Sequence, residues 1–161
     1  MSKTNKPRNP VDVAAFLDGL GLRHAYRLSY VTSALVGPGY DDVKRDTGLI
    51  RAEYLLLLCL AHEDALTAQD IARMTRRPRN SISRAVHRMQ AEGFITRTPD
   101  PEDGRQSRLG ITDKGRAMQT RVEAILAARE AELFQVLDSG DQDDLDRILT
   151  RLAHHAARLS R

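Results

Sequence analysis

The chain has 161 residues and a formal net charge of only +3, from 25 Lys and Arg residues against 22 Asp and Glu residues. This length fits one domain better than two and needs no disulfide to stabilise its core. The single cysteine, Cys59, excludes an internal disulfide and fits a reducing compartment. The longest apolar run, residues 54–61, is too short to span a bilayer, and no signal-peptide segment follows the polar N-terminus. We therefore expect a soluble, cytoplasmic protein that does not bind membranes.

The N-terminal third of the chain predicts a tail and two helices. Residues 1–10 are polar and basic and contain two prolines, which is typical of a flexible tail. Apolar residues recur at helical spacing over 11–36 and predict an amphipathic helix. We expect it to end at the Gly-Pro-Gly of residues 37–39, before a charged connection over 40–48. Residues 49–63 predict a second helix, whose run of four leucines indicates a central position.

A pair of short helices is expected next. Thr67 and Asp70 have the spacing of a capping box, which predicts a helix that ends near Met74. Pro78 suits the first position of a second helix, which ends near Ala91. The order of a short helix, a turn and a helix is typical of a helix-turn-helix.

A β-hairpin is expected after these helices. Gly93 suits the left-handed residue that follows a helix. Residues 94–98 and 107–111 predict two strands, and the turn-forming residues 99–104 predict the loop between them. Together with the preceding helices, this hairpin makes a winged helix-turn-helix.

The C-terminal part predicts two further helices. Thr112 begins a long helix, and Ser139 with Gln142 has the spacing of a capping box for the last one. The last helix carries an apolar stripe that continues to its final turn. Its members are Leu145, Ile148, Leu149, Leu152, Ala156 and Leu159. A second copy of the chain is the expected partner of this stripe, because the long helix beside it already serves the core.

The small net charge conceals one strongly basic segment. Residues 73–97 contain seven arginines, no lysine and one acid, Glu92, which gives a net charge of +6 and leaves −3 for the remainder. An arginine-rich surface is often only a solvated one. The absence of lysine favours a surface that recognises phosphates and bases instead, since guanidinium groups bind these groups bidentately.

One helix of this segment has a face suited to DNA. Ile82, Val86 and Met89 recur at helical spacing and are expected to pack inward. The opposite face then shows short polar and cationic residues, the types that contact base edges and phosphates in the major groove. They are Arg79, Asn80, Ser83, Arg84, His87 and Arg88, with Ser81 at the flank.

Four stretches resemble the multiple antibiotic resistance regulator (MarR) family. They are residues 66–72 (LTAQDIA), residues 81–95 (SISRAVHRMQAEGFI), and residues 100–105 (DPEDGR) followed by 109–115 (LGITDKG). The resemblance covers about residues 12–160. It implies a mostly α-helical fold with a small β-hairpin wing, in which N- and C-terminal helices dimerise the chain. The implied parts are an N-terminal dimerisation helix and connection (11–48), a DNA-binding winged helix-turn-helix (49–112), and a long helix with the C-terminal dimerisation helix (113–161).

The resemblance also assigns roles at the DNA. It implies base contacts from Asn80, Ser81, Ser83 and Arg84, and phosphate contacts from Arg76, Arg77, Arg79 and Arg88. In the wing, Arg105 would reach the minor groove with Asp103 orienting it, although Gly104 stands where the family usually has a further arginine. The expected homodimeric regulator, a repressor as most of the family are, binds a pseudo-palindromic operator with half-sites about 10 bp apart.

The family resemblance further implies release from DNA by a small molecule, often an aromatic acid. All four tyrosines lie within residues 26–54, and cationic side chains lie near two of them. The expected ligand-binding residues are His24, Tyr26, Arg27, Tyr30, Tyr40 and Tyr54. The alternative is that these tyrosines only pack between helices.

Other functions stay open as alternatives. A redox-responsive regulator would need a reactive Cys59, and a zinc-responsive one could use Cys59 with His62 but lacks further ligands nearby. A winged-helix module for protein contacts or non-specific DNA binding is a third possibility. We expect no enzyme, cofactor or metal site, because the sequence has no phosphate-binding loop, catalytic triad or paired carboxylates in a plausible cleft.

Overall fold

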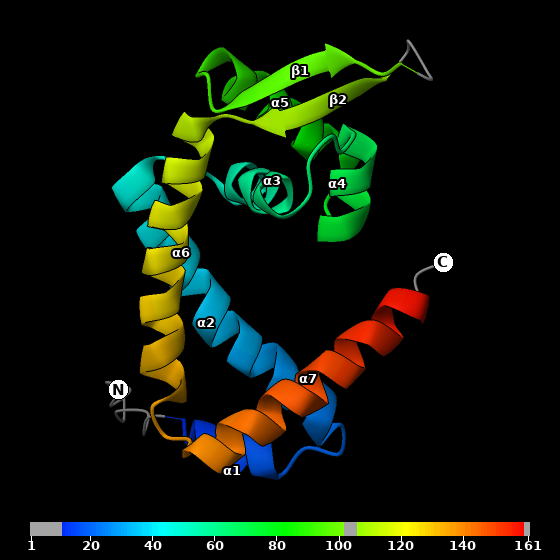
Figure 1. The fold of residues 1–161 in the computed structure, drawn as a ribbon. Coiled ribbons are helices and arrows are strands. Elements are labelled where there is room, and N and C mark those ends of the chain that lie inside the picture. Colours follow the sequence, from blue (N-terminus) through cyan, green and yellow to red (C-terminus); the bar gives the residue numbers. More distant parts are fainter. Residues whose placement is uncertain (1–10, 102–105, 160–161) are drawn as a thin grey trace, which may run out of the picture. The chain divides into compact units, whose positions relative to one another are not determined.

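The computed structural model describes residues 11–101 and 106–159 (Figure 1). The predicted tail and the wing residues Asp103, Gly104 and Arg105 lie outside these ranges. The elements are α1 (Val13–Asp18), α2 (Arg23–Thr47), α3 (Arg51–His62), α4 (Ala68–Thr75), α5 (Arg79–Ala91), β1 (Ile95–Pro99), β2 (Ser107–Ile111), α6 (Asp113–Phe134) and α7 (Ser139–Leu159). The predicted mostly helical fold with a β-hairpin is confirmed. The described chain contains no helix that is both long and apolar enough to cross a bilayer.

The chain divides into two compact units, Met1–Gly37 and Pro38–Arg161. In the first unit the predicted single helix over 11–36 is wrong, because α1 ends at Asp18 and α2 begins only at Arg23. Two glycines in the intervening residues explain the break, since glycine is a poor helix former. Asp12 caps α1 by accepting a hydrogen bond from the Ala15 N–H at 3.0 Å.

The predicted helix end at residues 37–39 is also wrong. The helix α2 continues to Thr47, so residues 40–47 are helical rather than a connection. Pro38 removes one intrahelical donor, but packing within the second unit holds the residues that follow it. Gly39 is buried so close to α6 that an added Cβ would lie 3.0 Å from the Leu126 side chain, and Asp42 forms an ion pair with Arg129 of α6.

The core of the second unit lies around α3, as the leucine run predicts. Leu56, Leu57 and Leu60 are almost fully buried, and α4, α5, α6 and β2 all contact this helix. The side chains that meet it include Ile71 of α4 and Ile82 of α5, which are also fully buried. This shared core fixes α4, α5 and the hairpin as one body.

Local signals place the ends of the next elements correctly. The Thr67 hydroxyl accepts from the Asp70 N–H and the Asp70 carboxylate accepts from the Thr67 N–H, both at 3.1 Å, which is the predicted capping box. Pro78 is the N-cap of α5, one position before the first helical residue where it was expected, and Gly93 is left-handed with φ +75°. The strands β1 and β2 pair antiparallel, with Ile95 opposite Ile111.

The hairpin has a third backbone partner. Leu66, before α4, forms an isolated antiparallel bridge with Leu109 of β2. The Leu109 N–H donates to the Leu66 carbonyl at 2.9 Å, and the Arg108 guanidinium donates to the Ala65 carbonyl at 3.0 Å. The hairpin is thereby attached to the start of the helix-turn-helix.

The last helix begins with a different cap from the one expected. The Asp138 carboxylate, not the Ser139 hydroxyl, accepts from the Asp141 N–H, at 2.8 Å. Aspartate ranks with serine as a capping residue, and the chain uses the one that stands a position earlier. The apolar stripe of α7 is exposed in the single chain, with Leu152 at 49% and Leu159 at 73%.

Candidate nucleic-acid interface

The turn between α4 and α5 is set by backbone geometry. Arg76 is left-handed with φ +52°, and its N–H caps the end of α4 by donating to the Arg73 and Ala72 carbonyls. The chain reverses there, and Ile82 and Met89 of α5 then turn into the core. The rest of α5 consequently faces outward.

The outward face of α5, defined here as Arg79, Asn80, Ser83, Arg84 and His87, is exposed along its length. Within the described residues, none of these five side chains forms a hydrogen bond or an ion pair with another residue. Ser81 lies at its edge and is half-buried. The structure thus brings together, on one side of one helix, five of the seven α5 residues that sequence reasoning assigned to DNA; the other two are Ser81 and Arg88.

The arginines of the turn have different surroundings. The Arg76 guanidinium donates to the Ala156 carbonyl in the last turns of α7, at 2.9 Å. Arg77 is half-buried, and its Nε is buried without a hydrogen-bond partner among the described residues. Arg97 of β1 donates to the Ser107 hydroxyl at 2.9 Å.

Arg88 differs from the other α5 arginines because its guanidinium, although its side chain is 43% exposed, pairs with two carboxylates. Its Nη1 lies 2.8 Å from Glu53 Oε2, and its Nε lies 2.7 Å from Glu92 Oε1. The Glu53 side chain is only 3% exposed. The expected phosphate contact of Arg88 stays a prediction. Sequence reasoning missed Glu53, although a single acid within the apolar α3 was a signal that this carboxylate has a partner.

A cavity of about 260 Å³ lies between α4, α5 and the strands of the hairpin. Its walls combine polar or cationic groups with apolar surface, and its lining includes Gln69, Ser83, His87, Arg97 and Leu109. Two of these residues belong to the outward face of α5. Sequence reasoning missed this cavity because its walls come from four separate elements.

The tyrosines divide between the two units. In the second unit, Tyr40 lies on α2 rather than in a connection, and its hydroxyl shares a hydrogen bond of 3.0 Å with that of Tyr54. The Arg51 guanidinium carbon lies 4.3 Å from the centre of the Tyr40 ring. Burial, together with the bond to Tyr40, raises the pKa of Tyr54 well above its ordinary value.

In the first unit, the other candidate ligand residues have neighbours of their own. Tyr26 packs edge-to-face on Phe16, with ring centres 5.6 Å apart, and Arg27 pairs with Asp18 at 2.6 Å. His24 and Tyr30 are exposed. Within the second unit, the structure brings together Tyr40 and Tyr54 of the predicted ligand set.

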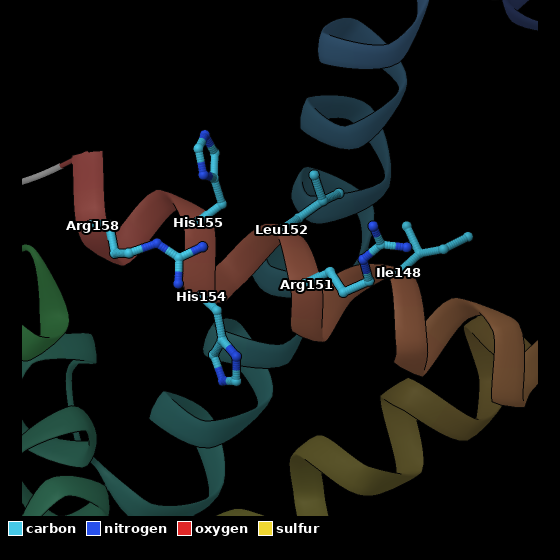
Figure 2. Close-up of a pocket in the computed structure, with 6 residues that line it drawn as sticks. All are labelled: Ile148, Arg151, Leu152, His154, His155 and Arg158. Atoms are coloured by element: carbon cyan, nitrogen blue, oxygen red, sulfur yellow. The ribbon is translucent and has the colours of Figure 1, made fainter.

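A second hollow, of about 490 Å³, lies along α7. Its lining residues, all from this helix, are Ile148, Arg151, Leu152, His154, His155 and Arg158. Figure 2 shows His154 and His155 on opposite sides of the helix. No group of three or more His, Cys, Asp or Glu side chains in the described ranges could hold a metal ion. Cys59 is buried, and burial raises the pKa of its thiol.

Comparison with known proteins agrees with this architecture. Residues 47–106, which contain α3, the helix-turn-helix and the first strand of the hairpin, match the model of the MarR family. The HTH-type transcriptional repressor Rv2887 of Mycobacterium tuberculosis is 24% identical over 125 residues, which are 78% of this chain and 90% of that protein.

Solved structures share the fold. A crystal structure of MarR superposes with a TM-score of 0.74 and 24% identity, over 82% of this chain and 92% of that one. Rv2887 in complex with salicylic acid gives a TM-score of 0.67 and 24% identity, over 84% and 98% of the two chains. Over residues 47–106 the chain thus matches the model of the MarR family, and its fold is that of the solved MarR proteins.

Proposed function

We propose that the chain is a repressor that binds a pseudo-palindromic operator through α5. The observation that carries this proposal is the outward face of α5. It presents two guanidinium groups without partners among the described residues, and short polar side chains lie between them. Leaving such groups without partners has no structural benefit, whereas in the major groove they would bind phosphates and base edges.

Within this face we divide the roles by position. Asn80, Ser83 and Arg84, with Ser81 at the edge, read base edges in the major groove, because the N-terminal residues of a recognition helix lie deepest. Arg79 and Arg77 each hold a phosphate. Arg76 is proposed as a further phosphate contact, and the wing residue Arg105 as a contact in the minor groove.

The test is selection of bound sequences from a random pool, followed by salt titration. We expect a palindromic consensus with half-sites about 10 bp apart. Arg84→Ala should cost about 1–3 kcal/mol and relax specificity at one base pair. Arg79→Ala should weaken all sequences alike and lower the salt slope by about one for each protomer. A pool without any enriched sequence would instead favour a module for protein contacts or non-specific DNA.

We also propose that the chain acts as a homodimer formed in part by α7. The apolar stripe of this helix is exposed. Four aspartates lie in the N-terminal half of α7, at residues 141–146, and arginines follow at 147, 151 and 158. An antiparallel pairing of two copies would bury both stripes and bring opposite charges together.

The oligomeric state tests this directly. Leu152→Glu places a charge in the stripe and should yield a monomer in sedimentation velocity, with loss of operator affinity. Thr150→Glu, at an exposed position off the stripe, is the matched control and should remain dimeric. A wild-type chain that sediments as a monomer at micromolar concentration would contradict the proposal.

A small aromatic acid is the proposed effector. Support comes from solved relatives, one in complex with salicylic acid and another, BpsR of Bordetella bronchiseptica, regulated by 6-hydroxynicotinic acid. The cavity between α5 and the hairpin is the favoured site, because Arg97 supplies a cation there and an occupant would adjoin the DNA-reading residues. The cluster of Tyr40, Tyr54 and Arg51 is the alternative site.

Paired substitutions separate the two sites. Salicylate should release the wild-type chain from its operator. Arg97→Ala should raise the salicylate concentration needed about tenfold if the cavity is the site, and Arg51→Ala should do so if the tyrosine cluster is. Indifference of the wild-type chain to every aromatic acid tried would leave the tyrosines with a packing role only.

A further inference from the structure

Glu53 lies where α2, α3 and α5 come together. It is in the first turn of α3 and almost completely buried. Its carboxylate accepts from the Ile50 N–H at 2.8 Å, which closes the start of α3. The same carboxylate accepts from Arg88 Nη1 through both oxygens, at 2.9 and 2.8 Å.

Arg88 is the α5 side of this contact. It lies in the last turn of the helix, next to the buried Met89. Its Nη groups also approach the carbonyl of Gly48, at 3.4 Å, and its Nε is bound by Glu92. One guanidinium therefore joins the end of the recognition helix to the α2–α3 turn and to the first turn of α3.

This pair differs in kind from the surface ion pairs of the chain. Exposed pairs contribute little because water already solvates both charges. Glu53 is out of reach of water, so its charge depends on Arg88 and the Ile50 N–H for compensation. The planar guanidinium also fixes direction, which a single apolar contact does not.

Because the pair lies at the C-terminal end of α5, a small rotation there displaces the residues at the N-terminal end of the helix. Arg79 lies nine residues before Arg88, or about 13 Å along the helix at 1.5 Å per residue. A rotation of about 5° at the Arg88 end moves the N-terminal residues of α5 by about 1 Å. Displacements of that size are enough to spoil hydrogen bonds to base edges.

We propose that Glu53 and Arg88 are positioning residues, which hold α5 at the orientation that operator reading requires. The charge of Arg88 serves the buried carboxylate and not a phosphate. This inference rests on the proposed DNA-binding function and assigns specificity to a residue, Glu53, that no DNA reaches.

The test compares Glu53→Gln with Arg88→Ala and Arg88→Lys. The amide introduced by Glu53→Gln would still accept from the Ile50 N–H but has no charge for Arg88. If the pair positions α5, Glu53→Gln lowers operator affinity by about tenfold and lowers the ratio of operator to non-specific affinity. The salt slope stays at the wild-type value in all three variants, because no phosphate contact is lost.

A phosphate-binding Arg88 predicts the opposite results. Glu53→Gln would then release the guanidinium and leave operator affinity unchanged or raised, and Arg88→Ala would lower the salt slope by about one for each protomer. Either result overturns the inference. Arg116→Ala, which removes the same charge from an exposed pair with Asp64, is the matched control for net charge.

Folding and function are separated in the same experiment. Circular dichroism at the assay temperature identifies any variant that is not folded, and Glu53→Gln and Arg88→Lys remain informative if Arg88→Ala unfolds. A double variant should lose no more affinity than the larger single loss, because the two residues act as one unit. If the wild-type chain selects no DNA sequence, the proposed function itself is overturned. If the wild type is selective and Glu53→Gln keeps the same ratio of operator to non-specific affinity, only this inference is overturned.

Discussion

Replacing Gly115 with alanine should separate the first turn of α6 from the backbone at the start of the hairpin. The added Cβ would lie 2.2 Å from the Phe94 carbonyl oxygen and 2.7 Å from Cγ1 of Ile111. Both distances are far below a normal van der Waals contact, so the backbone must retreat by about 0.8 Å. The Phe94 oxygen cannot do so freely, since it accepts from the Thr112 N–H at 3.1 Å and from the Thr112 hydroxyl at 3.0 Å.

The magnitude follows from these contacts. Two weakened hydrogen bonds cost about 1 kcal/mol each, and overpacking adds about 1–3 kcal/mol. The better helix propensity of alanine returns about 1 kcal/mol. We expect the free energy of unfolding to fall by about 2–4 kcal/mol, which lowers Tm by roughly 5–15 °C for a chain of this size.

Urea and thermal unfolding followed by circular dichroism, at one protein concentration, measure this change. The matched control is Gly140→Ala in the first turn of α7, whose added Cβ meets only the Asp138 side chain at 3.4 Å. That variant should be equal to the wild type or up to about 1 kcal/mol more stable. A Gly115→Ala variant as stable as the control would refute the close packing of α6 on the Phe94 backbone.

Two further predictions concern titratable groups. Hydrogen bonds, above all the one from the Thr67 hydroxyl, hold the pKa of Asp70 below its ordinary value of 3.8. The ionised carboxylate therefore stabilises the fold fully above pH 3.8, and progressively less as the pH falls through the lowered pKa. The stability advantage of the wild type over Asp70→Asn should therefore stay constant at neutral pH and shrink as the pH falls below about 4. Urea unfolding at each pH checks this, and an advantage that does not change with pH would contradict the hydrogen-bonded carboxylate. Cys59 is buried, and burial raises the pKa of its thiol, so a thiol reagent at neutral pH should label it only after unfolding in urea; equal labelling of the folded chain would restore the redox-responsive alternative.

Local chemistry made much of the second unit predictable from the sequence. The Thr67–Asp70 capping box, the left-handed Gly93 and the strand over 107–111 depend on residues next to each other in the chain. Hydrophobic periodicity likewise identified the inward side of α5 and hence its outward face. These signals are strong because each satisfies backbone or packing needs within one or two turns.

Tertiary contacts account for what the sequence did not predict. The Gly-Pro-Gly at 37–39 has every local property of a helix end, and α2 passes through it because Gly39 and Asp42 pack on α6. The partner of Arg88 lies 35 residues away in the chain. No spacing rule connects two residues at that separation. The sequence therefore did not show that Arg88 pairs with a buried carboxylate.

The attachment of Leu66 to the hairpin also limits aggregation through the edge of β2. A two-stranded sheet has two unpaired edges, and each is a template for another chain to add a strand and begin aggregation. On β2 the backbone bridge from Leu66 occupies part of that edge. On β1 the strand ends at Pro99, which has no N–H to offer. Both edges of the hairpin therefore offer fewer free backbone groups to which another chain could add a strand.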